Sequence, residues 1–82
     1  MHKLSIYSVY DRTAQVFGSP FFFSGERADK LAQRAFAQAV EDKSSPIGKS
    51  PADYELHMIG TMDVITGFVA GMGPDRVSVK LS

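Results

Sequence analysis

The chain contains no cysteine, and this absence removes two of the usual ways to stabilise a small domain. Neither disulfide bonds nor thiolate metal sites can form. A chain of 82 residues also buries only about 60% of the surface that its unfolded form exposes. The sequence therefore predicts a single domain, residues 1–82, that hydrophobic burial holds together and that a second subunit would stabilise further.

An excess of charge of one sign is also lacking. Nine Lys and Arg residues balance nine Asp and Glu residues, so the formal net charge is zero. This balance argues against a protein that coats nucleic acid through its overall charge, and any such contact must come from a local patch. No apolar stretch is long enough for a signal peptide or a membrane span, so we expect a soluble protein of the cytoplasm.

Residues with catalytic chemistry are scarce. The histidines are His2, near the N-terminus, and His57, two residues after Glu55. A His57–Glu55 pair can serve as a base and its orienting group, but a cross-strand or solvated surface pair is the favoured interpretation. The aspartates that stand in predicted turns, where they bond to the backbone rather than to a metal, are Asp11, Asp63 and Asp75. We therefore expect a protein that is not an enzyme and that binds no cofactor or metal.

Two extended segments open the chain. Residues 3–10 are rich in β-branched and aromatic side chains, which favours a strand, and a turn follows at residues 11–13. A second extended segment covers residues 15–23 and is broken at residues 18–20, because Pro20 cannot donate to a β-ladder. The two segments predict a hairpin.

Residues 24–42 carry the helical pattern of the chain, with Ser24 as the expected N-cap. Apolar side chains recur at steps of three and four residues and predict one buried stripe. The stripe consists of Ala28, Leu31, Ala32, Ala35, Phe36, Ala39 and Val40. Its alanines allow close approach to a sheet, with Leu31, Phe36 and Val40 as the larger contacts.

The second half of the chain predicts a loop and further strands. Two prolines and a glycine predict a loop over residues 43–51, and strands are expected at 54–60 and 68–70 around a turn at 63–67. Residues 71–82 are expected to form an extra strand or a dimer arm. The fold class is α+β, with one α-helix packed on an antiparallel sheet of four to five strands in the order β-β-α-β-β-(β).

Aromatic residues are more numerous near the N-terminus than one small core requires. Successive side chains of a strand point to opposite faces, so the three rings of Phe21, Phe22 and Phe23 cannot all face one core unless the strand is distorted. At least one ring is then left for a partner, such as a second copy, a flexible segment or the bases of single-stranded nucleic acid. The rings that we expect at a nucleic-acid site are those of Tyr7, Tyr10 and Phe22.

Cations gather on one predicted face of the helix and in the loop after it. The residues of this cationic strip are Arg27, Lys30, Arg34, Lys43 and Lys49. Such a strip can follow a phosphate backbone, although neighbouring acidic residues at Glu26, Asp29 and Glu41 also fit an ordinary solvated face. Arg12, next to the aromatic residues Tyr10 and Phe17, is a second candidate contact with a single strand.

Several short motifs, in order and at matching spacing over residues 3–67, resemble the small non-structural proteins of gokushoviruses, which are tailless single-stranded DNA bacteriophages. These motifs are residues 6–11 (IYSVYD), 20–22 (PFF), 51–56 (PADYEL), 59–63 (IGTMD) and 66–67 (TG). The resemblance implies a phage protein made in the infected bacterium that binds DNA at the switch from duplex replication to single-strand synthesis and packaging.

Two functions follow as competing hypotheses. The first is a dimeric protein that binds single-stranded DNA without strong sequence preference during phage replication and packaging. The second is a protein-interaction factor that binds a replication enzyme, a procapsid or a host protein. The resemblance favours the first hypothesis, and the neutral net charge favours the second.

Overall fold

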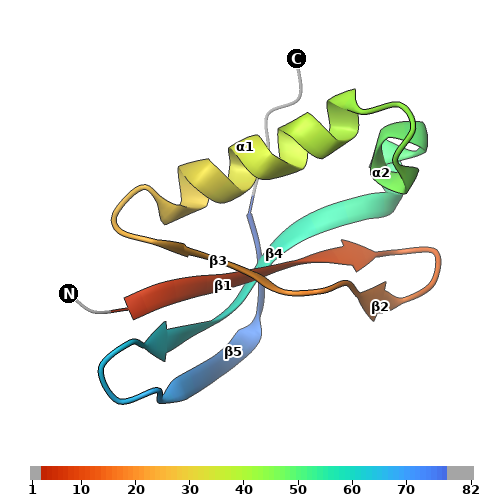
Figure 1. Cartoon of the computed structure of the whole chain (residues 1–82). Coiled ribbons are helices and arrows are strands. Elements are labelled where there is room, and N and C mark those ends of the chain that lie inside the picture. The colour runs from red at the N-terminus through yellow and green to blue at the C-terminus, as the bar shows by residue number, and fades with distance from the viewer. Residues whose placement is uncertain (1–2, 78–82) are drawn as a thin grey trace.

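The computed structural model describes residues 3–77, and for residues 72 and 74–76 it describes the backbone only. One long helix lies across one face of a strongly twisted antiparallel sheet (Figure 1). The elements in chain order are β1 (Lys3–Asp11), β2 (Val16–Phe17), β3 (Phe21–Ser24), α1 (Ala28–Glu41), α2 (Pro46–Lys49), the 3₁₀ turn η1 (Pro51–Asp53), β4 (Tyr54–Asp63) and β5 (Val69–Arg76). The predicted α+β class, with one main helix on an antiparallel sheet, is confirmed.

Strand β1 is the centre of the sheet and is paired along both edges. Its one edge pairs with β4, which in turn pairs with β5. Its other edge pairs first with β3, where Ile6 lies opposite Phe22, and then with β2, where Tyr10 lies opposite Phe17. Strands β2 and β3 are therefore the two halves of the predicted second strand, separated at residues 18–20 as the proline predicted.

Irregular pairing bends the sheet at its middle. The register of β1 against β4 shifts between Ile6 and Tyr7, and that of β4 against β5 shifts between Met58 and Gly60. Ile59 is the extra residue of β4 in its pairing with β1, whereas in the pairing of β4 with β5 the extra residues lie on β5, and such bulges increase the local twist. Gly60 is required at this point, because a Cβ there would lie 2.6 Å from the carbonyl oxygen of Ala70 on β5.

The core lies between α1 and the sheet face beneath it. Its buried residues are Tyr7, Ala28, Ala32, Phe36 and Leu56. The small alanines bring α1 close to the sheet, as the sequence predicted. Leu31, expected as a large core contact, is instead 39% exposed, because it lies at the margin of the buried stripe.

Tyr7 is fully buried in this core, which corrects its prediction as a nucleic-acid contact. The side chains of α1 and of β3 cover the Tyr7 ring on this face of β1, so a base cannot reach it. The rings of Phe21 and Phe23 pack on that of Tyr7, with centroid distances of 6.0 and 6.3 Å. Phe22 points to the other face and is 47% exposed, so alternation along β3 does leave one ring of the three outside the core.

The predicted N-cap at Ser24 is wrong by three residues, since the N-cap of α1 is Arg27. Ser24 ends β3, where it lies opposite Leu4, and its hydroxyl does not cap the helix. Gly25 then turns the chain with a φ of +88°, which glycine adopts without strain, and α1 begins at Ala28. Pairing with a strand distant in sequence therefore overrides the local capping signal.

The predicted loop at 43–51 contains a short helix, which corrects that prediction. Ser45 caps α2 by accepting a hydrogen bond of 2.9 Å from the Gly48 amide, and Pro46 takes the first helical position, where its missing N–H costs nothing. A Cβ on Gly48 would lie 1.8 Å from the carbonyl oxygen of Asp42. Glycine at this position thus lets α2 fold back against the end of α1.

The last described strand is longer than predicted. β5 runs through the Gly71–Gly73 segment and Pro74, where a break was expected, and it includes Asp75, which was expected in a turn. β5 is the edge strand beyond β4, and Pro74 lies in the irregular stretch between the paired residues Gly71 and Asp75, where a residue that cannot donate to the ladder is tolerated. Of the proposed extra strand or dimer arm, residues 71–82, the first six residues belong to β5, and residues 78–82 lie outside the described residues.

One hydrogen bond joins the central strand to α1. The Tyr7 hydroxyl donates to Oδ1 of Asp29, in the first turn of α1, at 2.5 Å. Burial and the Asp29 carboxylate together raise the pKa of Tyr7 to about 12 from 10.0, and a hydrogen bond with Ser5 offsets part of this rise. Tyr7 is therefore neutral over the physiological pH range.

This raised pKa predicts a loss of stability at high pH. Because the folded pKa of Tyr7 lies above the unfolded value, its contribution is complete below pH 10 and is lost as the pH rises through about 12. The loss should amount to about 2–3 kcal/mol. Urea unfolding of the wild type and of Tyr7→Phe at pH 8 and pH 11.5 tests this: the wild type should be more stable at pH 8 and lose much of that advantage at pH 11.5. A constant difference between the two proteins would contradict the prediction.

Candidate nucleic-acid interface

The molecule is elongated, and its two ends differ. The β1–β2 turn and α2 lie at one end, which we call the hairpin end, and the β4–β5 turn lies at the other (Figure 1). The hairpin end collects several of the residues predicted to contact nucleic acid. It is built from segments far apart in sequence, since the Arg12 amide donates to the carbonyl oxygen of Asp53 at 2.8 Å.

Asp11 shapes the turn at the hairpin end. Its Oδ1 accepts hydrogen bonds of 3.0 and 3.1 Å from the amides of Thr13 and Ala14, and Gln15 closes the turn with a φ of +60°. Asp63 forms the same kind of turn at the opposite end, accepting from the amides of Ile65 and Thr66 at 2.8 and 3.3 Å. The backbone role predicted for these two aspartates is confirmed.

An aromatic cluster lies on the sheet face that α1 leaves uncovered. The rings of Tyr10 and Phe17 are 4.8 Å apart, and that of His57 lies 5.5 Å from Phe17 and 6.0 Å from Tyr10. Tyr10 is half-buried in the cluster, whereas Phe17 is 40% exposed. Phe22 shares this face further along the edge of β1. The uncovered face therefore offers two exposed phenyl rings.

Arg12 extends from the turn beside this cluster with a side chain that is 60% exposed. Its Nε lies 3.7 Å from Oε2 of Glu55, and its Nη1 donates to the carbonyl oxygen of Ala52 at 3.3 Å. The other carboxylate oxygen of Glu55 lies 3.1 Å from Nε2 of His57. Glu55 thus contacts Arg12 and His57 together, an arrangement that orients the Arg12 guanidinium over the hairpin end.

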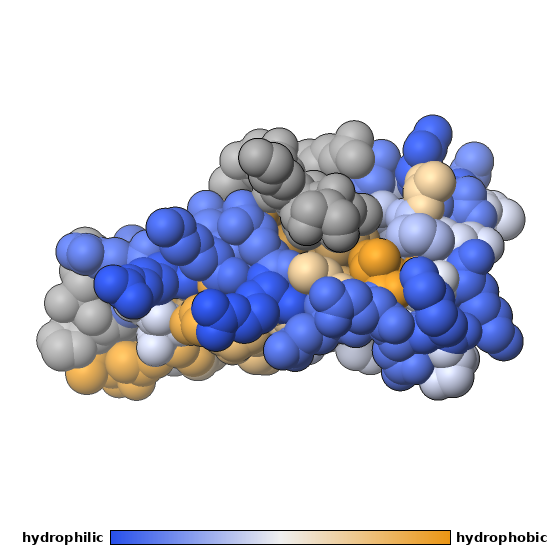
Figure 2. All heavy atoms as spheres, turned by 90° about the horizontal axis from the view of Figure 1, so that it is seen from above, coloured by the Kyte–Doolittle hydropathy of each residue, from blue (hydrophilic) through white to orange (hydrophobic). Residues whose placement is uncertain are grey.

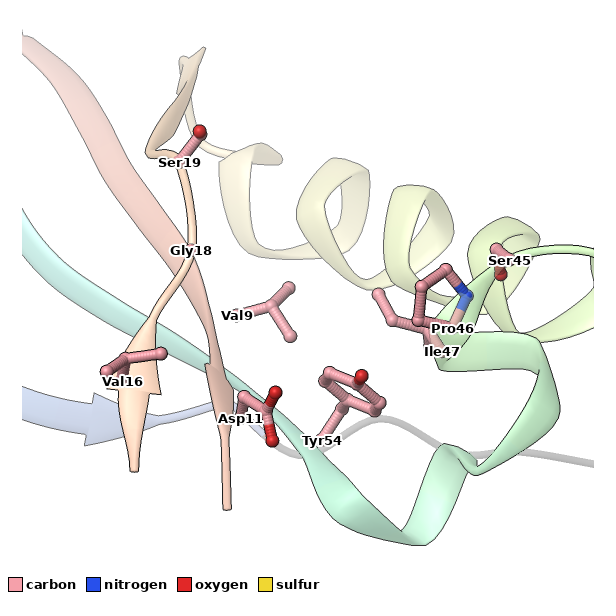
Figure 3. Close-up of a pocket in the computed structure, with 9 residues that line it drawn as sticks. All are labelled: Val9, Asp11, Val16, Gly18, Ser19, Ser45, Pro46, Ile47 and Tyr54. Carbon is pink, nitrogen blue, oxygen red and sulfur yellow. The ribbon is translucent and has the colours of Figure 1, made fainter. Parts of the chain in front are cut away.

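A hollow of about 380 Å³ opens between the crossing of the broken strand and α2 (Figure 3). Its lining residues are Val9, Asp11, Val16, Gly18, Ser19, Ser45, Pro46, Ile47 and Tyr54. A smaller hollow of about 210 Å³ shares Val9 and Ile47 with it and continues beneath α1 to Phe36. Apolar walls dominate both hollows, and the Asp11 carboxylate faces the larger one.

Three predicted cations, Arg27, Lys30 and Arg34, lie exposed on the side of α1 away from the core. Figure 2 shows the α1 side of the molecule as a largely hydrophilic surface, with apolar atoms near its centre. The ion pairs of the described residues join Arg12 and His57 to Glu55, and none involves these three cations. Direct pairing with neighbouring carboxylates therefore does not occupy them.

The predicted site divides into two surfaces. The three cations of α1 and the aromatic cluster lie on opposite sides of the sheet, so one short strand cannot contact both without passing around an edge. Two further exposed cations instead belong to the segment after α1: Lys43 comes two residues after the end of α1, and Lys49 is the last residue of α2. The structure thus brings Arg12, Lys43 and Lys49 to the hairpin end.

Sequence reasoning missed the larger hollow. Ile47 and Tyr54 reach it from the segment that was predicted as a loop and from β4, while Val9 reaches it from β1. Two local signals indicated its parts: the Gly18–Pro20 break in the strand and the Ser45–Pro46 helix start. Neither signal indicates that the two segments lie side by side.

Within residues 3–77, no helix is long and apolar enough to cross a membrane. In the same part of the chain, no group of three or more His, Asp or Glu side chains is placed to hold a metal ion.

Almost the whole sequence matches a known protein family. Residues 4–81 match the model of a protein family described as Phage ORF5 protein. No curated protein and no solved structure matches the chain.

Proposed function

Because the chain belongs to the Phage ORF5 protein family, we propose that it binds single-stranded DNA without strong sequence preference, as a non-structural protein of viral DNA replication and genome packaging. The motifs shared with gokushoviruses support a single-stranded DNA phage as its source and the host bacterial cytoplasm as its place of action. The observation that carries the proposal is the hairpin end, which has the exposed ring of Phe17 on the uncovered sheet face, a hollow on the α1 face, and Arg12, Lys43 and Lys49 in the turn and the α2 segment that form this end.

Aromatic stacking supplies the part of the binding that does not depend on charge. Phe17 and Phe22 present exposed rings on the uncovered sheet face, and the ring of Tyr10 packs against that of Phe17. Every base has a flat face, so stacking on such rings is tolerant of sequence. This mode of binding suits a protein whose net charge is zero.

Cations supply the part of DNA binding that depends on charge, and they form a local patch. Arg12, Lys43 and Lys49 lie at the hairpin end. The cations of α1 can contact further phosphates of a DNA strand that continues around the molecule. Each phosphate contact adds about −0.7 to the slope of log affinity against log salt for a single strand. Three contacts therefore predict a modest slope, of about two units.

Two triple variants with the same loss of charge test which cations contact phosphates. We expect replacement of Arg12, Lys43 and Lys49 by glutamine to weaken binding of an oligonucleotide and to flatten its salt slope by about two units. Replacement of Arg27, Lys30 and Arg34 by glutamine should have a smaller effect on both quantities. Fluorescence anisotropy at several salt concentrations measures them.

Other outcomes of that comparison are informative. Equal effects of the two triple variants would place the phosphate track along α1 as well as at the hairpin end. An effect of the α1 variant alone would show that the hairpin end is the wrong site. Absence of single-strand binding by the wild type at low salt would overturn the proposed function.

Truncation of the exposed rings tests the stacking. Phe17→Ala and Phe22→Ala should each weaken DNA binding by about 1–3 kcal/mol, with little change in the salt slope, since a stacked base contributes about this much. Leu31→Ala is the matched control, because Leu31 is 39% exposed against 40% for Phe17 but lies on α1. Equal affinities of wild type and both phenylalanine variants would remove these rings from the site.

The end opposite the hairpin end favours the second candidate function, protein interaction. Val64, Ile65, Phe68 and Val69 are 48%, 71%, 69% and 56% exposed around the β4–β5 turn. Exposed apolar groups gathered in one place are typical of protein contact sites. A second copy of the chain, a replication enzyme or a capsid protein are the partners proposed for this surface.

We expect this surface to join two copies into a homodimer. Sedimentation of the wild type at micromolar concentration should report twice the chain mass of 9.0 kDa, and Ile65→Ser with Phe68→Ser should return the monomer because it removes the exposed apolar area. Leu31→Ser serves as the control at a distant exposed apolar site. A monomeric wild type would contradict the dimer, and a dimeric double variant would place the interface elsewhere.

A further inference from the structure

The larger hollow at the hairpin end has the properties of a site for one planar ring with polar edges. We propose that it takes a single nucleobase of the bound strand and that it prefers a base with an exocyclic amino group over thymine. This inference rests on the proposed binding of single-stranded DNA. It adds to that function a base-selective contact, which the exposed rings alone do not provide.

The walls of the hollow match the faces of a base. Val9, Val16 and Ile47 supply aliphatic contacts, and the Tyr54 ring lies near the middle of the lining (Figure 3). A volume of about 380 Å³ stands at the lower end of the range for small-ligand sites and is sufficient for one base. Gly18 has no side chain to close the side where the broken strand crosses.

The polar edge of the hollow is the Asp11 carboxylate. Its Oδ1 is engaged by the turn amides of Thr13 and Ala14, while its Oδ2 has no hydrogen-bond partner among the described residues. A carboxylate oxygen accepts from the amino group of cytosine, adenine or guanine. Thymine has no amino group, and the two carbonyl oxygens that flank its single N–H repel a carboxylate, so thymine is the poorer partner for Asp11.

Charge decides which part of a nucleotide enters. A phosphate would meet the negative Asp11 carboxylate in mainly apolar surroundings, which is unfavourable for two like charges. Arg12 follows Asp11 directly, and Lys49 stands two residues after Ile47, so cations flank the residues that line the hollow. The phosphates can remain with these cations while the uncharged base occupies the hollow.

The other occupant that fits apolar walls is a side chain of a partner protein. The carboxylate at the edge separates the two, because an apolar side chain has nothing to donate to Asp11. The experiment therefore uses DNA of defined base composition on the full chain, with the residues of the hollow as direct reporters.

Methyl NMR of the full chain with oligodeoxycytidine and oligothymidine of equal length locates the base. We expect the methyl signals of Val9, Val16 and Ile47 to shift with oligodeoxycytidine, and those of Val64 and Ile65, at the opposite end, to stay in place. Oligodeoxycytidine should bind about tenfold more tightly than oligothymidine, within the range of one specific base contact.

Asp11→Asn tests the polar edge. Asparagine keeps an oxygen for the turn amides but adds an amide donor, so the preference for oligodeoxycytidine should fall from about tenfold to about threefold or less. Asp63→Asn is the matched control, because it makes the same change of charge in the equivalent turn at the other end and should leave the preference unchanged.

Each other outcome decides against the inference in a recognisable way. If both oligonucleotides bind with equal affinity and the methyl signals of the hollow do not shift, the base pocket is wrong while DNA binding stands. If neither oligonucleotide binds at low salt, the proposed function fails and the pocket fails with it. If Asp63→Asn lowers the preference as much as Asp11→Asn does, the effect comes from net charge and the proposed role of Asp11 is wrong.

Discussion

The burial of Tyr7 on the central strand is the constraint on which the rest of the structure depends. Strand β1 is paired along both edges, and Tyr7 projects from its middle into the core between α1 and the sheet. A buried hydroxyl needs a partner, and Asp29 supplies one from the first turn of α1. The bond aligns the start of α1 with the centre of β1, and the alanines of α1 then pack on the neighbouring strand residues.

This arrangement assigns the two faces of the sheet. The face beneath α1 takes Tyr7, Leu56, Phe21 and Phe23 and forms the core. The other face keeps Tyr10, Phe17 and Phe22, which no described helix covers. A single helix suffices for one face of so small a sheet, so the aromatic residues of the second face are available to a partner. The proposed DNA contact is at the hairpin end. The exposed apolar side chains of the β4–β5 turn make the opposite end the proposed site of protein contact.

The break in the second strand has a functional consequence in this scheme. At residues 18–20 the chain leaves β2 and crosses to β3, while Ser8 holds the crossing by donating a hydrogen bond of 2.8 Å to the carbonyl oxygen of Gly18. The crossing forms one wall of the larger hollow, and α2 forms the opposite wall. The chain has no net charge, but its charged and apolar groups are unevenly distributed. The hairpin end carries exposed cations, and the opposite end carries exposed apolar side chains.

The sequence by itself determined the α+β class, the long helix, the paired strands and the exposure of one phenyl ring in the Phe21–Phe23 triplet. These features follow from local periodicity, because a period of 3.6 or 2 residues defines which side chains share a face. The family match over residues 4–81 also came from sequence alone.

Only the tertiary structure decided which face α1 covers, and so whether Tyr7 or Tyr10 is buried. It also moved the start of α1 from Ser24 to Ala28, since Ser24 pairs with β1, and it turned part of the predicted loop into α2. The hollow joins Val9, Ile47 and Tyr54, which no local pattern relates. The physical reason is the same in each case: burial and pairing depend on segments distant in the chain, whose approach is set by the packing of the whole domain.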